Sequence, residues 1–248
     1  MRERWRLVTG SALLYTLAFN LTFFIQELFL VVPKALTPGL RPTLFHNNHL
    51  WQGEHPLASL FQGTGALAIF TSAIVCMFLL RGSRIRSTTV RLFLVWMAFS
   101  GFFQALPQVV FGAFIAGNDV GMAMNYLHMS QTAKMTAALV AVAALIPIGA
   151  ALAREMLRFM PLSVSLSALA AIPLIILFRV PREWLEVLLP PVLCTIVGLA
   201  AIYATAWRVR TVSRIENPQP VSIVYPLVAV IVLLLVFQLV LRPGIEFY

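Results

Sequence analysis

The stretch LVTGSALLYTLAFNLTFFIQELFLVVP, residues 7–33, is the part of the chain from which the fold is most directly read. It is long and apolar enough to cross the hydrocarbon core of a bilayer, about 30 Å thick, as a helix that rises about 1.5 Å per residue. It nevertheless carries an acidic residue, Glu27, deep inside the apolar run. The stretch therefore predicts a membrane-spanning helix with a polar site inside it.

The rest of the chain repeats this pattern. Of its 248 residues, 60% are hydrophobic and only 11% are charged, whereas soluble domains carry about 25% charged residues. In lipid only helices and closed barrels pair all their backbone N–H and C=O groups. The apolar blocks lack the two-residue alternation of barrel strands, so they are expected to be helices. We therefore expect an all-α integral membrane protein, a single polytopic domain over residues 1–248. Its seven transmembrane helices are expected at residues 7–33, 57–80, 92–117, 132–153, 160–178, 187–207 and 221–241.

The basic residues predict an orientation for these helices. Arginines cluster in the opening segment MRERWR and in every second connection, while the other connections carry few basic residues. By the positive-inside rule the N-terminus is cytoplasmic and the C-terminus lies outside. The net charge of +9 then faces anionic lipid headgroups, and no nucleic-acid partner is needed to explain it. Short loops and this bias suit a plasma membrane, the inner membrane of a bacterium.

Histidines concentrate in the first outer loop, residues 34–56, which is rich in proline and glycine and is expected to be structured. The pattern HNNH, residues 46–49, can bring two imidazoles to one ion, and imidazole with carboxylate suits zinc or another divalent transition metal. The alternative is an ordinary solvent-side turn. The candidate ligands are His46, His49 and His55, and the candidate acid or base groups are Glu27, Glu54 and His128.

Polar residues inside the first four helices point toward the same outer side. A carboxylate such as Glu27 is costly in a membrane unless it is paired, protonated or in contact with a wet cavity. We therefore expect a polar cavity that opens outward, although hydrogen bonding between helices would explain the same residues. Its predicted lining is Asn20, Lys34, Gln62, Gln104, Gln108, Asn125, Gln131 and Lys134.

Three functions remain open at this stage. The first is a metal-assisted hydrolase or transferase that acts on a lipid or peptide at the outer leaflet. The second is a non-catalytic subunit whose apolar fifth to seventh helices dock a larger membrane complex. The third is a small-molecule or proton-coupled transporter whose path is lined by Glu27, Lys34, His128 and Lys134. In every case the lipid bilayer is a partner.

Overall fold

A computed structural model of the protein describes residues 2–82, 85, 87–159, 161–207 and 221–248. Two sequence predictions fall partly outside these residues. They are the start of the fifth helix at Met160 and the arginine clusters that support the orientation, of which Arg84, Arg86, Arg208, Arg210 and Arg214 are not described.

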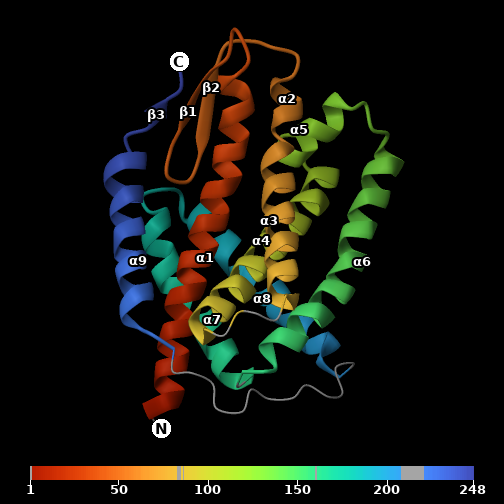
Figure 1. The fold of residues 1–248 in the computed structure, drawn as a ribbon. Coiled ribbons are helices and arrows are strands. Elements are labelled where there is room, and N and C mark those ends of the chain that lie inside the picture. The colour runs from red at the N-terminus through yellow and green to blue at the C-terminus, as the bar shows by residue number, and fades with distance from the viewer. Residues whose placement is uncertain (1, 83–84, 86, 160, 208–220) are drawn as a thin grey trace.

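A bundle of long helices forms most of the structure (Figure 1). The long helices are α1 (Arg2–Ala35), α3 (Thr64–Arg81), α4 (Thr88–Phe114), α6 (Gln131–Met156), α7 (Pro161–Arg179), α8 (Trp184–Ala206) and α9 (Val224–Leu235), and the π-helix η1 (Val236–Leu241) continues α9. Two short helices, α2 (Ala58–Phe61) and α5 (Asp119–Tyr126), lie between them.

Six helical segments are long and apolar enough to cross a membrane, so the protein is a multi-pass helical membrane protein. Within the described residues these segments are Arg4–Ala35, Ala58–Arg81, Thr88–Phe114, Gln131–Met156, Trp184–Ala206 and Val224–Leu241. The sequence predicts seven crossings. The remaining segment, Ser163–Arg179, is an apolar helix that is shorter than the other six.

Helices α1 and α4 form the centre of the bundle. Helix α1 packs against α3, α4, α7 and α9, while α4 also contacts α6 and α8. Aromatic rings fill the contact, and the Tyr15 and Trp96 ring centroids lie 4.5 Å apart. Their polar ends are satisfied, because Trp96 Nε1 donates to Ser11 Oγ at 2.9 Å and the Tyr15 hydroxyl lies 2.9 Å from Thr195 Oγ1. Buried aromatic groups of this kind normally find such partners.

A small antiparallel sheet, which the all-helical expectation did not include, covers one end of the bundle. Strands β1 (Arg41–Leu44) and β2 (His49–Gln52) form a hairpin that pairs Leu44 with His49, and β3 (Ile245–Glu246) adds to the other edge of β1. The hairpin follows α1 and sits at the upper end in Figure 1, opposite the start of α1. We call this end of the bundle the hairpin end. The loop expected to be structured is therefore a β-hairpin.

The predicted second helix is divided in two. Its residues form α2 and α3, and Gln62 and Gly63 lie at the junction. Helix α5 was not predicted from the sequence. It begins where the Asn118 side chain accepts a hydrogen bond from the Val120 backbone N–H at 3.2 Å. Asparagine is a favoured N-cap because its side-chain oxygen satisfies an amide at the helix start. Both short helices lie at the hairpin end (Figure 1).

The contact between α3 and α4 requires glycine at position 101. A Cβ atom there would lie 2.6 Å from the Ile69 carbonyl oxygen and 2.8 Å from Ala73 Cβ. We expect Gly101→Ala to lower the free energy of unfolding by about 1–3 kcal/mol, the usual cost of overpacking. Unfolding titrations in mixed detergent micelles measure this change. Gly117→Ala is the matched control, since nothing lies within 4 Å of its added Cβ, and equal stability of the two variants would contradict the packing argument.

Candidate functional site

The Glu27 carboxylate meets an imidazole from the hairpin. His49, the first residue of β2, places Nδ1 2.8 Å from Glu27 Oε2 on α1. The two side chains are only 5% and 6% exposed, respectively, so water screens the contact little. The hairpin therefore closes over α1 and supplies the partner that a buried carboxylate needs.

A second contact fixes the proton on the other ring nitrogen of His49. The fully buried Lys34 donates from Nζ to the Leu30 carbonyl oxygen at 2.8 Å and to Gln62 Oε1 at 3.0 Å. His49 Nε2 lies 2.9 Å from the same Gln62 oxygen. Because an ammonium only donates, the atom it meets must be the amide oxygen, and Nε2 must then carry a hydrogen. One further proton is shared between His49 Nδ1 and Glu27.

Trp51 completes this arrangement from the same face of β2, two residues after His49. Its ring stacks on the His49 imidazole with a centroid distance of 5.8 Å and an interplanar angle of 14°. Lys34 Nζ lies 4.7 Å from the centroid of the same ring, a distance at which the π-face attracts a cation. We call Glu27, Lys34, His49, Trp51 and Gln62 the Glu27 network.

A second carboxyl group lies close to this network. Asp119, the first residue of α5, is half-buried, and its burial raises the pKa of its carboxyl group above the usual value. The Glu27 carboxylate raises that pKa further, whereas His49 and Lys34 oppose the shift. Two nearby acids that cannot both ionise easily favour protonation of one of them.

Asp119 also lines a pocket of about 200 Å³ between α1, α4, the start of α5 and α8. Most of the lining is aromatic or aliphatic, and the polar part consists of amides and this carboxyl group. The lining residues are Phe23, Gln26, Phe103, Gln104, Pro107, Gln108, Phe111, Asn118, Asp119, Leu189, Pro190, Leu193 and Cys194.

The glutamines of the pocket are tied to one another and to α1. Gln108 Nε2 donates to Gln26 Oε1 at 2.8 Å and to the Gln104 carbonyl oxygen at 3.1 Å. Gln104 Nε2 lies 3.4 Å from the Phe19 carbonyl oxygen. The neighbouring Asn20 is fully buried, and its Oδ1 atom has no hydrogen-bond partner among the described residues. The structure thus brings Gln104 and Gln108 into one pocket with Gln26, and buries Asn20 beside them.

The three loop histidines do not converge. His46 lies in the hairpin turn, where burial and the cations Arg182, Arg242 and Arg179 lower the pKa of its imidazole. His55 Nδ1 accepts a hydrogen bond from the Leu57 backbone N–H at 3.2 Å, and the neighbouring Glu54 is exposed. No group of three or more His, Cys, Asp or Glu side chains in the described part of the chain lies close enough to hold a metal ion.

The remaining predicted cavity residues lie away from the network, at the junction of α5 and α6. Lys134 Nζ donates to Asn125 Oδ1, and Gln131 Nε2 donates to the Ala113 carbonyl oxygen at 3.1 Å. His128 is exposed and adopts a left-handed backbone with φ of 51°. These residues fasten the α5–α6 turn to α4, and they do not line the pocket described above.

Sequence reasoning missed Asp119, which connects the pocket to the Glu27 network. One signal was present, because Asp119 is the only aspartate in the chain and follows a helix-capping asparagine. What the sequence did not reveal is that α5 packs against α2 and α4 and brings Asp119 within electrostatic reach of Glu27.

Comparison with protein-family models, with curated proteins and with solved structures finds no match to this chain.

The Glu27 network predicts a large loss of stability when Gln62 Oε1, the acceptor shared by Lys34 and His49, is removed. Gln62→Met keeps the approximate shape of the side chain but leaves Lys34 Nζ and His49 Nε2 without their oxygen partner. We expect the free energy of unfolding to fall by about 2–4 kcal/mol, because the buried His49 Nε2–H then lacks an acceptor and the Lys34 ammonium keeps only the Leu30 carbonyl oxygen. Unfolding in mixed micelles checks this value. Gln52→Met on the exposed part of β2 is the control and should change stability by less than about 0.5 kcal/mol; a similar small change in Gln62→Met would contradict the network.

Proposed function

We propose that the protein is a proton-linked carrier that exchanges a small amphipathic organic cation for a proton at the pocket between α1, α4, α5 and α8. One observation carries the proposal. Asp119 is the only acidic residue among the described residues that line this pocket, and it interacts electrostatically with the buried Glu27 network.

Competition between a proton and a cation for one carboxyl group provides the coupling. The raised pKa of Asp119 favours its protonated form, and Glu27 contributes to that shift. A cation that binds beside Asp119 stabilises the carboxylate instead, so binding must expel the proton. By the reciprocity of linked equilibria, protonation must weaken cation binding by the same factor.

The lining of the pocket suits a cation that also carries an apolar group. Phe103 and Phe111 contribute aromatic rings to the walls, and such rings attract cations. The Phe23 ring also lines the pocket, but the Arg179 guanidinium already lies 4.3 Å from its centroid. The amides of Gln26, Gln104 and Gln108 offer hydrogen-bonding groups, and the aliphatic remainder can cover an apolar portion. A pocket with mostly apolar walls and a few polar groups is typical of small-molecule sites.

Buried polar groups continue from the pocket toward the other end of the bundle, which supports a path for exchange. Asn20 Oδ1, Ser100 Oγ and Gln104 Oε1 are buried and have no hydrogen-bond partner among the described residues. Unpaired buried oxygens are costly unless they bind water or a proton donor. Tyr15 and Thr195, at 2.9 Å, form a further buried polar pair on α1 and α8.

The two other candidate functions have weaker support. A metal-assisted hydrolase or transferase would need ligands that the described residues do not gather, and both ring nitrogens of His49 are already engaged by Glu27 and Gln62. A non-catalytic subunit that docks a larger complex through the three apolar helices α7, α8 and α9 remains a proposal from composition, because lipid would cover the same surfaces.

We also propose that the chain crosses a bacterial inner membrane seven times, with Ser163–Arg179 as one of the crossings. The hairpin end then faces away from the cytoplasm. An odd number of crossings suits the arrangement of the chain, since α1 begins at one end of the bundle and β3 pairs with β1 at the other (Figure 1). Arginines on the end where α1 begins, among them Arg4, Arg81 and Arg154, support the orientation by the positive-inside rule.

The carrier proposal predicts a pH-dependent affinity for benzyltrimethylammonium, a permanent cation with an aromatic group. We expect binding to the purified protein, measured by calorimetry, to weaken as the pH falls through the raised pKa of Asp119. Asp119→Asn should lower the affinity at least about tenfold and abolish the pH dependence. Glu27→Gln should keep binding but move its pH midpoint downward, because removal of the Glu27 charge lowers the pKa of Asp119.

Glu183→Gln, an exposed carboxylate at the start of α8, is the matched control and should leave the profile unchanged. Transport is tested by uptake of the labelled cation into proteoliposomes against an imposed proton gradient. Wild-type affinity and an unaltered pH profile in Asp119→Asn would refute the proposal.

The proposed orientation predicts the accessibility of single introduced thiols. The native Cys76 and Cys194 are only 8% and 2% exposed, so they contribute little background labelling. In intact cells a membrane-impermeant maleimide should label Glu54→Cys at the hairpin end but not Arg154→Cys on α6. Arg154→Cys should react only after permeabilisation, and the reverse pattern would invert the orientation.

A further inference from the structure

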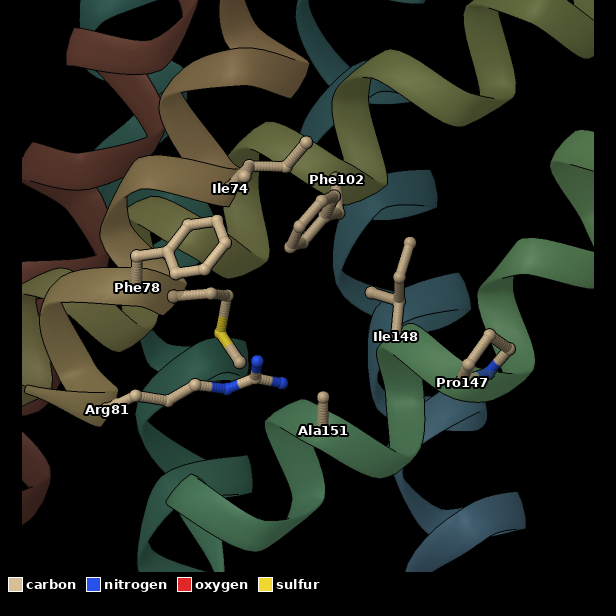
Figure 2. Close-up of a pocket in the computed structure, with 8 residues that line it drawn as sticks. Ile74, Phe78, Arg81, Phe102, Pro147, Ile148 and Ala151 are labelled. Carbon is tan, nitrogen blue, oxygen red and sulfur yellow. The ribbon is translucent and has the colours of Figure 1, made fainter.

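A separate pocket lies on the opposite half of the bundle, between α3 and α6 with α4 behind it (Figure 2). Its volume is about 280 Å³. Helices α3 and α6 both pack against α4, so their side chains form the two walls and Phe102 of α4 contributes to the floor. The lining residues are Ile74, Met77, Phe78, Arg81, Phe102, Pro147, Ile148 and Ala151.

The pocket is apolar except at one end. Seven of its eight lining residues carry no charged or hydrogen-bonding side-chain group, and Arg81 is the exception. Phe78 on its rim is 65% exposed, which is ordinary for a side chain that faces hydrocarbon. A groove of this composition on a membrane-spanning surface favours an acyl chain as its occupant.

Arg81 lies in the last turn of α3, at the end of a candidate membrane-spanning segment. Figure 2 shows its guanidinium group extending from α3 toward Ala151 of α6, beyond Phe78 and the other apolar side chains. Arg81 forms no hydrogen bond or ion pair with any residue that the structure describes. Within the described part of the chain its five donors therefore have no partner.

The surroundings of Arg81 favour an anionic partner. The same end of the bundle carries Arg91, Arg154 and Arg158, and the Glu155 carboxylate there is already engaged by Arg91 and Arg158. A guanidinium group binds a phosphate in a bidentate manner, and basic pockets between membrane helices attract anionic headgroups.

We propose that this pocket binds one anionic phospholipid of the bilayer. The phosphate contacts Arg81 at the end of α3, and an acyl chain follows the apolar groove toward Ile74 and Phe102. The order of charge and apolar surface along the groove matches that of a lipid, whose headgroup lies at the membrane boundary and whose chains point inward. The site is independent of Asp119 and of the proposed carrier function.

Native mass spectrometry of the detergent-purified protein tests the site, with phosphatidylglycerol and the zwitterionic phosphatidylcholine as probes of equal chain length. Wild-type protein should retain phosphatidylglycerol in preference. Arg81→Gln should weaken phosphatidylglycerol binding about tenfold, the effect of losing one charge-assisted contact. It should weaken phosphatidylcholine binding less, because the choline cation already neutralises the phosphate of that lipid. Ala151→Phe, which fills the groove while keeping Arg81, should weaken the binding of both lipids.

Arg154→Gln is the matched control, because Arg154 is an exposed arginine at the same end that does not line the pocket. It should reduce phosphatidylglycerol binding less than twofold. Equal losses in Arg81→Gln and Arg154→Gln would indicate diffuse attraction to the basic surface and would overturn the proposal. Equal retention of the two lipids by the wild-type protein would also overturn it.

Discussion

A carboxylate within a membrane-spanning helix must find its compensation inside the protein, and most of the hairpin end is organised by that requirement. Glu27 lies on α1, where lipid and apolar helices offer no hydrogen-bond donor. His49 supplies one at 2.8 Å, and it reaches α1 only because residues 41–52 fold back as a hairpin. Gln62, at the junction of α2 and α3, in turn accepts from His49 and from Lys34.

The buried Glu27 network also acts electrostatically on Asp119, which is more exposed than the network. The Glu27 network is sealed beneath the hairpin, whereas Asp119 belongs both to the electrostatic surroundings of Glu27 and to the wall of a pocket. A charge that is fixed and buried can therefore influence a group that meets ligands. Active and binding sites often use neighbouring charges in this way to adjust an ionisable group.

The sequence predicted the membrane class and the approximate extent of the long helices, because apolar length and charge distribution are local properties of the chain. It also singled out Glu27, Lys34, His49 and Gln62, although it treated His49 as a metal ligand, Glu27 as an acid or base group, and Lys34 and Gln62 as lining of a polar cavity. The sheet, α5 and the role of Asp119 could not be read in this way. They depend on contacts between residues distant in sequence, such as the pairing of Leu44 with Ile245, for which a single sequence carries no periodic signal. The dispersal of His46, His49 and His55 has the same cause, since His46 lies in the hairpin turn, His49 begins β2 and His55 follows the end of that strand.

The order of residues along the chain has a consequence for biogenesis. Glu27 and its partner His49 are separated by 22 positions, and Gln62 follows later still, so the ribosome delivers α1 to the membrane before the groups that satisfy its carboxylate have been made. During that interval the acid can enter hydrocarbon cheaply only as the neutral species. The Glu27 carboxylate can therefore be compensated inside the bundle only after the hairpin has closed and supplied His49.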